Sequence, residues 1–188
     1  MAGKKALITP VIVAAILVLF ASQVVQAKTY KMTLGDTQGS TQWAMGEKFA
    51  ELFKVKTGGK YKVSMFPNGQ LGSEQDTIND ASMGTLDFSV LAINNITPFA
   101  PTVGVLTLPY VIQSLDEAVL LTYGEVGEEP VQNTIRDAGV RIVGWAYSGF
   151  RVLTNPKKPV TTVADLQGLV IRVPKNDIMI ATYQEWGY

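Results

Sequence analysis

The residues that follow position 28 alternate between the two periodicities that distinguish strands from helices. Residues 30–34 (YKMTL) and 61–66 (YKVSMF) each place every second apolar side chain on one face, as strands do. Residues 40–56 place apolar side chains on one helical face: Met45, Phe49, Leu52 and Phe53. A strand, a helix and a strand in this order form a βαβ unit, whose right-handed crossover makes the two strands parallel.

The same alternation continues after residue 66. A helix is expected over 73–83, with Ser73 as its N-cap and acidic residues in its first turn. Residues 86–92 (LDFSVLA) are more continuously apolar, which is typical of a strand covered on both faces. Residues 115–136 are predicted to be helical, and we expect breaks at glycine and proline. Those breaking residues are Gly124, Gly127 and Pro130.

The last third of the chain carries a second set of predicted elements. Residues 140–148 (VRIVGWAYS) are predicted to form a strand that continues in extended form over 150–155. A further strand is predicted at 169–173, and an amphipathic helix is expected from Asn176 onward. The expected fold class is α/β with a mostly parallel sheet, and such sheets bind ligands outside the carboxyl ends of their strands.

The first residues have the features of an export signal. Lys4 and Lys5 form a charged start, residues 11–21 are apolar, and small residues surround a cleavage point after Ala27. A transmembrane anchor is the alternative, but the apolar run is shorter than the ~20 residues needed to span a bilayer. We therefore expect residues 1–27 to be a signal peptide and the mature protein to be periplasmic.

Composition excludes several functions for the mature part. From Lys28 onward the chain has 14 basic and 16 acidic side chains, and it contains neither cysteine nor histidine. Disulfides, thiolate chemistry, Ser-His-acid triads and imidazole metal sites are therefore absent. No basic stripe points to nucleic acid or to a membrane surface. We expect no metal and no cofactor.

Enzyme motifs are also missing. The chain has no G-x-G-x-x-G, no Walker lysine loop and no G-x-S-x-G, so dinucleotide, ATP and esterase functions have no support. An exported hydrolase or lyase using Glu74, Asp76 or Tyr147 remains an alternative, although the missing histidine argues against it. The favoured prediction is that the protein is not an enzyme.

Arg172 is the residue that most indicates a binding function. If Leu169, Ile171 and Val173 face one side of a strand, Arg172 faces the other, and Pro174 places it at the carboxyl end. A guanidinium in a ligand crevice loses hydration unless a carboxylate meets it through two parallel hydrogen bonds. The alternatives are that Arg172 pairs with an acid of the protein or points into water.

Four other residues are candidates for the same crevice. Arg151 follows an aromatic and glycine-containing bend, and an ordinary surface position is the alternative. Asn94 and Asn95 follow the third predicted strand, where they are either ligand donors or part of a polar loop. Glu74 belongs to FPNGQLGSEQD (66–76), which is either a crevice wall with free backbone N–H groups or a well-capped turn before a helix.

Five stretches in order resemble the solute-binding proteins of tripartite ATP-independent periplasmic (TRAP) transporters, the DctP family. They are FPNGQLGSEQD (66–76), MGTLDFSV (83–90), LTLPYV (106–111), SGFRVLTN (148–155) and ADLQGLVIRVPKNDI (164–178). The resemblance covers essentially all of residues 29–186. It implies a periplasmic binding protein-like fold of two α/β lobes, type II-like. In these terms 28–148 is a nearly complete lobe I and 149–188 is the start of a truncated lobe II.

The resemblance also implies roles. Arg172 matches the arginine that pairs with the substrate carboxylate, and the positions of Arg151, Glu74 and Asn95 line the cleft in some members. The implied function is capture of a small organic acid for uptake by two membrane subunits, one small and one large, without nucleic acid as a partner. Because family members are about twice the length of an ordinary domain of ~150 residues, we expect this chain to be an N-terminal fragment. A receptor that presents its ligand to a sensor protein remains an alternative.

Overall fold

The computed structural model describes residues 27–188. The predicted signal peptide falls on residues that lie almost entirely outside this range. Among the described residues, no helix is long and apolar enough to cross a membrane.

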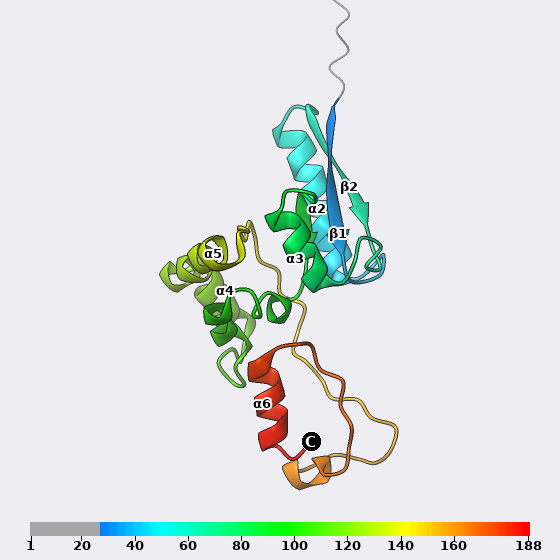
Figure 1. Cartoon of the computed structure of the whole chain (residues 1–188), viewed down its shortest axis with the longest axis vertical. Coiled ribbons are helices and arrows are strands. Elements are labelled where there is room, and N and C mark those ends of the chain that lie inside the picture. The colour runs from blue at the N-terminus through cyan, green and yellow to red at the C-terminus, as the bar shows by residue number, and fades with distance from the viewer. Residues whose placement is uncertain (1–26) are drawn as a thin grey trace, which may run out of the picture.

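A three-stranded parallel sheet forms the centre of the first part of the chain (Figure 1). Its strands are β1 (Lys28–Leu34), β2 (Tyr61–Phe66) and β3 (Phe88–Val90), in the order β2-β1-β3. Met32 of β1 lies opposite Met65 of β2 on one side and Phe88 of β3 on the other. The predicted parallel α/β sheet is therefore confirmed, with a third strand shorter than the predicted 86–92.

Helix α2 (Thr41–Lys56) covers one face of this sheet. Ser40 caps it, because the Ser40 hydroxyl accepts a hydrogen bond from the backbone N–H of Trp43. Phe49 of α2 packs edge-on against Phe88, with ring centroids 4.9 Å apart. The helix and the sheet together enclose a core built on Met32, Leu34 and Val90.

Helix α3 (Glu74–Ser82), which the capping pattern predicted, covers a second core. Ser73 and Asp76 form a reciprocal capping box, and hydrogen bonds from Ser73 lower the pKa of Asp76. Ile78 of α3 is buried against two short 3-10 helices, η1 (Ile93–Asn95) and η2 (Pro101–Thr107), and against the end of α5. The buried members of this core are Ile78, Ile96, Ala100, Val103 and Ala138.

The predicted helix over 115–136 divides into α4 (Leu115–Tyr123) and α5 (Glu125–Ala138). Only Gly124 breaks it, and Gly127 and Pro130, which were expected to break it further, lie buried inside α5. A Cβ at Gly127 would collide with the carbonyl oxygen of Thr122, so glycine permits the close approach of the two helices.

Two predicted strands are wrong: residues 140–148 and 169–173 belong to no strand and form no sheet. A strand requires a neighbour for its backbone hydrogen bonds, and the described sheet contains only β1, β2 and β3. Part of the backbone at 140–148 is bonded by a side chain instead. The hydroxyl of Tyr123 donates to the carbonyl of Trp145 at 2.9 Å and accepts from its N–H at 3.2 Å.

The alternation predicted for 169–173 is nevertheless present. Leu169 is buried, whereas Val170 is 93% exposed and Arg172 is exposed. A 3-10 helix, η3 (Val163–Leu166), precedes this segment. The helix predicted from Asn176 onward is α6 (Asp177–Glu185), and Asn176 is its N-cap.

Candidate functional site

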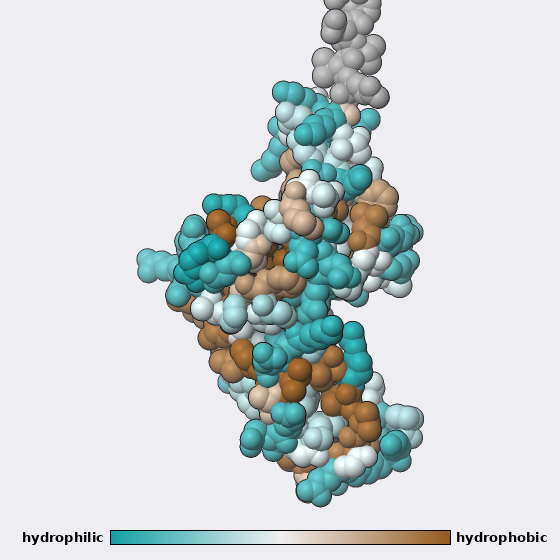
Figure 2. All heavy atoms as spheres, viewed as in Figure 1, coloured by the Kyte–Doolittle hydropathy of each residue, from teal (hydrophilic) through white to brown (hydrophobic). Residues whose placement is uncertain are grey.

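An open crevice lies at the carboxyl ends of the strands. It has a volume of about 2280 Å³ and is lined by the loops after β1 and β3, by parts of η2 and α4, by residues 139–153 and by residues 172–175. Pockets for small ligands usually measure about 300–1,000 Å³, so a small molecule alone would leave this crevice largely unfilled. Apolar side chains also reach the surface in the lower half of the molecule (Figure 2). The exposed apolar side chains of residues 139–188 include Val143, Phe150, Val152 and Val170.

Three of the four arginines of the chain line this crevice. They are Arg141, Arg151 and Arg172, and all three are exposed. Within residues 27–188 there are two salt bridges, Lys48 to Glu51 and Arg136 to Asp137, and neither involves a crevice arginine. The crevice therefore offers guanidinium groups that no described acid neutralises by a direct ion pair.

Arg172 lines the crevice, as the sequence pattern predicted, and lies two residues before Pro174. The predicted sheet strand does not place it there, because residues 169–173 belong to no strand. The two salt bridges of the described residues do not include Arg172, which argues against pairing with a described acid, whereas its exposure also fits the alternative that it points into water. Its role in ligand binding stays a prediction.

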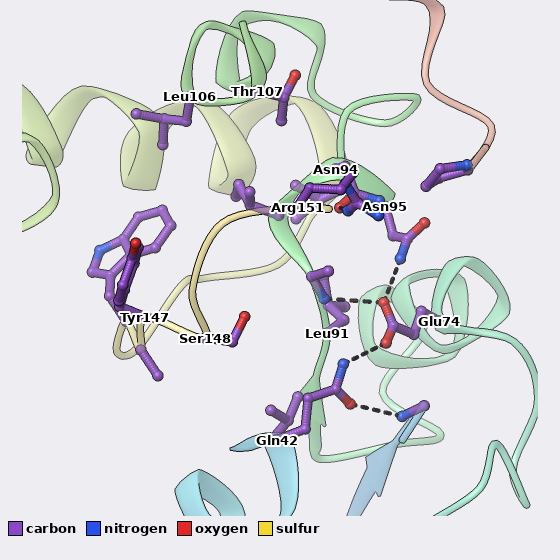
Figure 3. Close-up of a pocket in the computed structure, with 18 of the residues that line it drawn as sticks. Gln42, Glu74, Leu91, Asn94, Asn95, Leu106, Thr107, Tyr147, Ser148 and Arg151 are labelled. Carbon is purple, nitrogen blue, oxygen red and sulfur yellow. Dashed lines mark hydrogen bonds between the residues drawn. The ribbon is translucent and has the colours of Figure 1, made fainter. Parts of the chain in front are cut away.

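Arg151 and Asn94 are brought together although they are 57 residues apart (Figure 3). Nη2 of Arg151 donates a hydrogen bond of 3.3 Å to Oδ1 of Asn94. Asn94 is only 5% exposed, whereas Arg151 is exposed. A buried amide oxygen thus holds one end of the guanidinium and leaves its other donors at the crevice.

Glu74 is half-buried at the start of α3, where both carboxylate oxygens are hydrogen-bonded (Figure 3). Oε1 accepts from Nε2 of Gln42 at 2.7 Å, and Oε2 accepts from the backbone N–H of Ala92 at 3.0 Å and from Nδ2 of Asn95. Gln42 in turn accepts from the backbone N–H of Gly35 at 3.1 Å. These contacts favour a positioning role for Glu74, since its acceptors are engaged with the protein. Direct ligand contact by Glu74 or Asn95 stays a prediction.

Asn176 fastens the crevice segment 172–175 to the loop after β3. It is fully buried, and its Oδ1 accepts from the backbone N–H of Met179 to cap α6. Its Nδ2 donates to Oγ1 of Thr97 at 2.8 Å and to the carbonyl of Asn94 at 3.3 Å. One amide therefore connects Asn94, which holds Arg151, to the segment that carries Arg172.

Sequence reasoning missed three residues of this arrangement. Arg141 was assigned to a strand, although the scarcity of arginine was a signal for it. Gln42 is a glutamine inside a helix and carries no sequence signal. Asn176 was identified only as the start of a helix, and nothing in the sequence indicated its bonds across the crevice. The described residues contain no group of three or more acidic side chains placed to hold a metal ion.

Comparisons with known proteins agree with this geometry. Residues 33–188 match the family model of the DctP proteins, described as "Bacterial extracellular solute-binding protein, family 7". The 2,3-diketo-L-gulonate-binding periplasmic protein YiaO of Escherichia coli (strain K12) is 28% identical over 171 residues. That alignment covers 91% of this chain and 52% of the relative.

Solved structures of TRAP periplasmic solute-binding proteins have the same fold. The protein of Roseobacter denitrificans OCh 114 with bound L-galactonate superposes with a TM-score of 0.80 and 31% identity, over 86% of this chain and 53% of that one. The protein of Chromohalobacter salexigens with bound D-glucuronate gives a TM-score of 0.79 and 28% identity, over 84% and 52%.

These relatives are solute-binding proteins rather than enzymes. The present chain spans about half of the length of the relatives it matches. The α/β fold of the periplasmic binding proteins predicted from the sequence is confirmed by these structures. Because the family model matches most of the described residues, the chain belongs to family 7 of the bacterial extracellular solute-binding proteins, the DctP family.

Proposed function

We propose that this chain contributes the carboxylate-binding wall of a periplasmic solute-binding subunit of a TRAP transporter. The observation that carries the proposal is Arg172, an exposed guanidinium on the crevice that forms neither of the two salt bridges of the described residues. Its planar fork would hold the carboxylate of a small organic acid through two parallel hydrogen bonds. Arg151, fixed by Asn94, would supply a second cationic group at the same crevice.

The ligand class we propose is a hydroxylated acid of sugar size. Related proteins carry L-galactonate and D-glucuronate, and another is named for 2,3-diketo-L-gulonate. Arginine donors suit the carboxylate, and the crevice asparagines, Asn94 and Asn95, suit hydroxyl groups. The acid would enter the open crevice, and closure of a second wall would select the bound state for delivery to the two membrane subunits.

The size of the crevice limits the affinity of this chain by itself. A charge-assisted hydrogen bond contributes about 1.5–3 kcal/mol, whereas micromolar binding requires about 8 kcal/mol. The remaining affinity would come from walls that correspond to the other half of the relatives. We therefore expect the 188-residue chain to bind its ligand in the millimolar range or more weakly.

Ligand-observed NMR detects binding of this strength. Saturation transfer from the protein to D-glucuronate is expected for the chain, with little transfer to uncharged glucose. Arg172→Lys should remove most of the transfer, because an ammonium does not reproduce the fork. Arg136→Lys is the matched control, since Arg136 is paired with Asp137 away from the crevice. Equal transfer in the Arg172 and Arg136 variants would contradict the assignment, and micromolar binding by calorimetry would contradict the affinity estimate.

A further inference from the structure

Five exposed lysines gather at the end of the sheet that is opposite the crevice. One begins β1, two lie at the start of β2 and two lie in the last turn of α2: Lys28, Lys60, Lys62, Lys54 and Lys56. We call this group the lysine pole. None of its members lines the crevice.

Backbone contacts bring the three segments of the lysine pole together. The N–H of Lys28 donates to the carbonyl of Lys60 at 3.2 Å, and the N–H of Gly59 donates to the carbonyl of Lys54 at 2.8 Å. Lys62 lies opposite Thr29 in the parallel ladder of β1 and β2. Figure 1 shows the starts of both strands and the end of α2 at the same end of the sheet.

None of these five lysines forms either of the two salt bridges of the described residues. Residues 52–63 contain four lysines and no aspartate or glutamate. The preceding acid, Glu51, is bonded to Lys48 at 2.8 Å. The chain from Lys28 onward has more acidic than basic side chains. Surface charges are nevertheless screened beyond about 8 Å in physiological salt. The local excess of positive charge therefore decides which partners the lysine pole attracts. Four of the five lysines lie within residues 54–62, a short basic run that the sequence analysis did not identify, and the fold adds Lys28 to it.

The chemistry around the lysines matches the surface of a bilayer. Val55 lies between two of them in the sequence and is 67% exposed. Nζ of Lys28 lies 4.7 Å from the ring centroid of Tyr30, and Nζ of Lys60 lies 5.2 Å from that of Tyr61. Lysines beside an exposed apolar residue and tyrosine rings are typical of interfacial membrane contacts. Protein–protein interfaces, in contrast, are depleted in lysine and enriched in arginine.

The position of the N-terminal end of the described chain also favours a membrane contact at the lysine pole. The apolar run 11–21 and the predicted cleavage point after Ala27 immediately precede β1 in the sequence. The described chain enters the fold at the lysine pole, because Lys28 is the first residue of β1. Cleavage after Ala27 would add the α-amino group of Lys28 to the same end.

We propose that the lysine pole binds the surface of an anionic bilayer and leaves the crevice on the opposite side of the domain. The partner is a layer of acidic phospholipid headgroups, attracted by compact ammonium charges that need no fixed geometry. This contact is independent of the ligand-binding function proposed above. It would keep the exported protein close to the membrane while its crevice collects solute.

Vesicle flotation tests the proposal with the protein recovered from the cell envelope. Vesicles of phosphatidylcholine with and without phosphatidylglycerol separate attraction to charge from any apolar attachment. Binding is expected only with phosphatidylglycerol and should be lost in high salt. A lysine near an anionic bilayer strengthens binding about fivefold, so Lys54→Gln with Lys56→Gln should weaken binding about 25-fold.

The matched control replaces two exposed lysines elsewhere, Lys157→Gln with Lys158→Gln, which should leave binding unchanged. Circular dichroism verifies that both double variants remain folded. Equal binding to neutral vesicles, or equal losses in the two double variants, would overturn the proposal. Competition by soluble polyglutamate as strong as that by anionic vesicles would also overturn it, because it would show a general acidic-polypeptide site and not a membrane contact.

Discussion

The side chain of Asn176 donates a 2.8 Å hydrogen bond to the hydroxyl of Thr97, which lies 79 residues earlier in the chain. Both side chains are buried, and the same Asn176 amide also caps α6 and contacts the carbonyl of Asn94. A single residue therefore joins the start of α6 to the loop that holds Arg151.

Asn176→Ala is expected to destabilise the protein by about 2–4 kcal/mol, because it removes a helix cap and leaves the buried hydroxyl oxygen of Thr97 without its donor. Urea unfolding monitored by circular dichroism measures the change. Ser114→Ala, which removes only the hydroxyl cap of α4, is the control and should cost about 1 kcal/mol. Similar losses in both variants would show that the bonds of Asn176 across the crevice contribute nothing.

Glu74→Gln should destabilise the protein by about 1–3 kcal/mol, since the new amide group would place donors against the donors of Gln42, Ala92 or Asn95. The free energy of unfolding in urea provides the measurement. Glu47→Gln, on the exposed surface of α2, serves as the matched control and should be nearly neutral. If the two substitutions have the same effect, Glu74 does not brace the crevice, and a direct role in ligand binding would be favoured instead.

Asp165 is expected to titrate well below an ordinary carboxyl group. Hydrogen bonds from the backbone N–H groups and hydroxyls of Thr161 and Thr162 lower its pKa to about 2. Because the pKa is lower in the folded state than in the unfolded state, these bonds stabilise the turn before η3 above about pH 4. The stabilisation is lost as the pH falls from there toward 2.

Carbon-13 NMR of the Asp165 carboxyl group measures this pKa directly. A midpoint near 2 is expected for the native chain, and the turn in Asp165→Asn should lose its pH dependence in this range. A midpoint close to 4 would show that the four hydrogen bonds are not maintained in solution.

The elements that the sequence predicted well are those whose stability is local. Helix α2 and strands β1 and β2 combine a clear period with capping and turn residues, as at Ser40 and at the glycine pair 58–59. Residues 140–148 have an equally clear strand pattern but lack a neighbouring strand among the described residues. Periodicity shows which side chains share a face, and it does not show whether a partner is present.

The candidate site also has a part that the sequence predicted and a part that it did not. Position after β2 or β3 was enough to place Glu74, Asn94 and Asn95 on one crevice, because parallel strands bring their carboxyl ends to one edge. Arg151 and Arg172 also line it, but the strands predicted to place them there do not form. Their hydrogen-bond partners were not predictable. The acceptors of Glu74 are engaged by Gln42 of α2 and Asn95 of η1, two elements that meet only in the folded chain.

The position of a bound carboxylate tests the central claim most directly. A crystal structure of the chain grown with D-glucuronate should show its carboxylate against the guanidinium of Arg172, with two parallel hydrogen bonds of about 2.7–2.9 Å. A carboxylate bound elsewhere in the crevice, or Arg172 paired with an aspartate or glutamate of its own chain, would contradict the account.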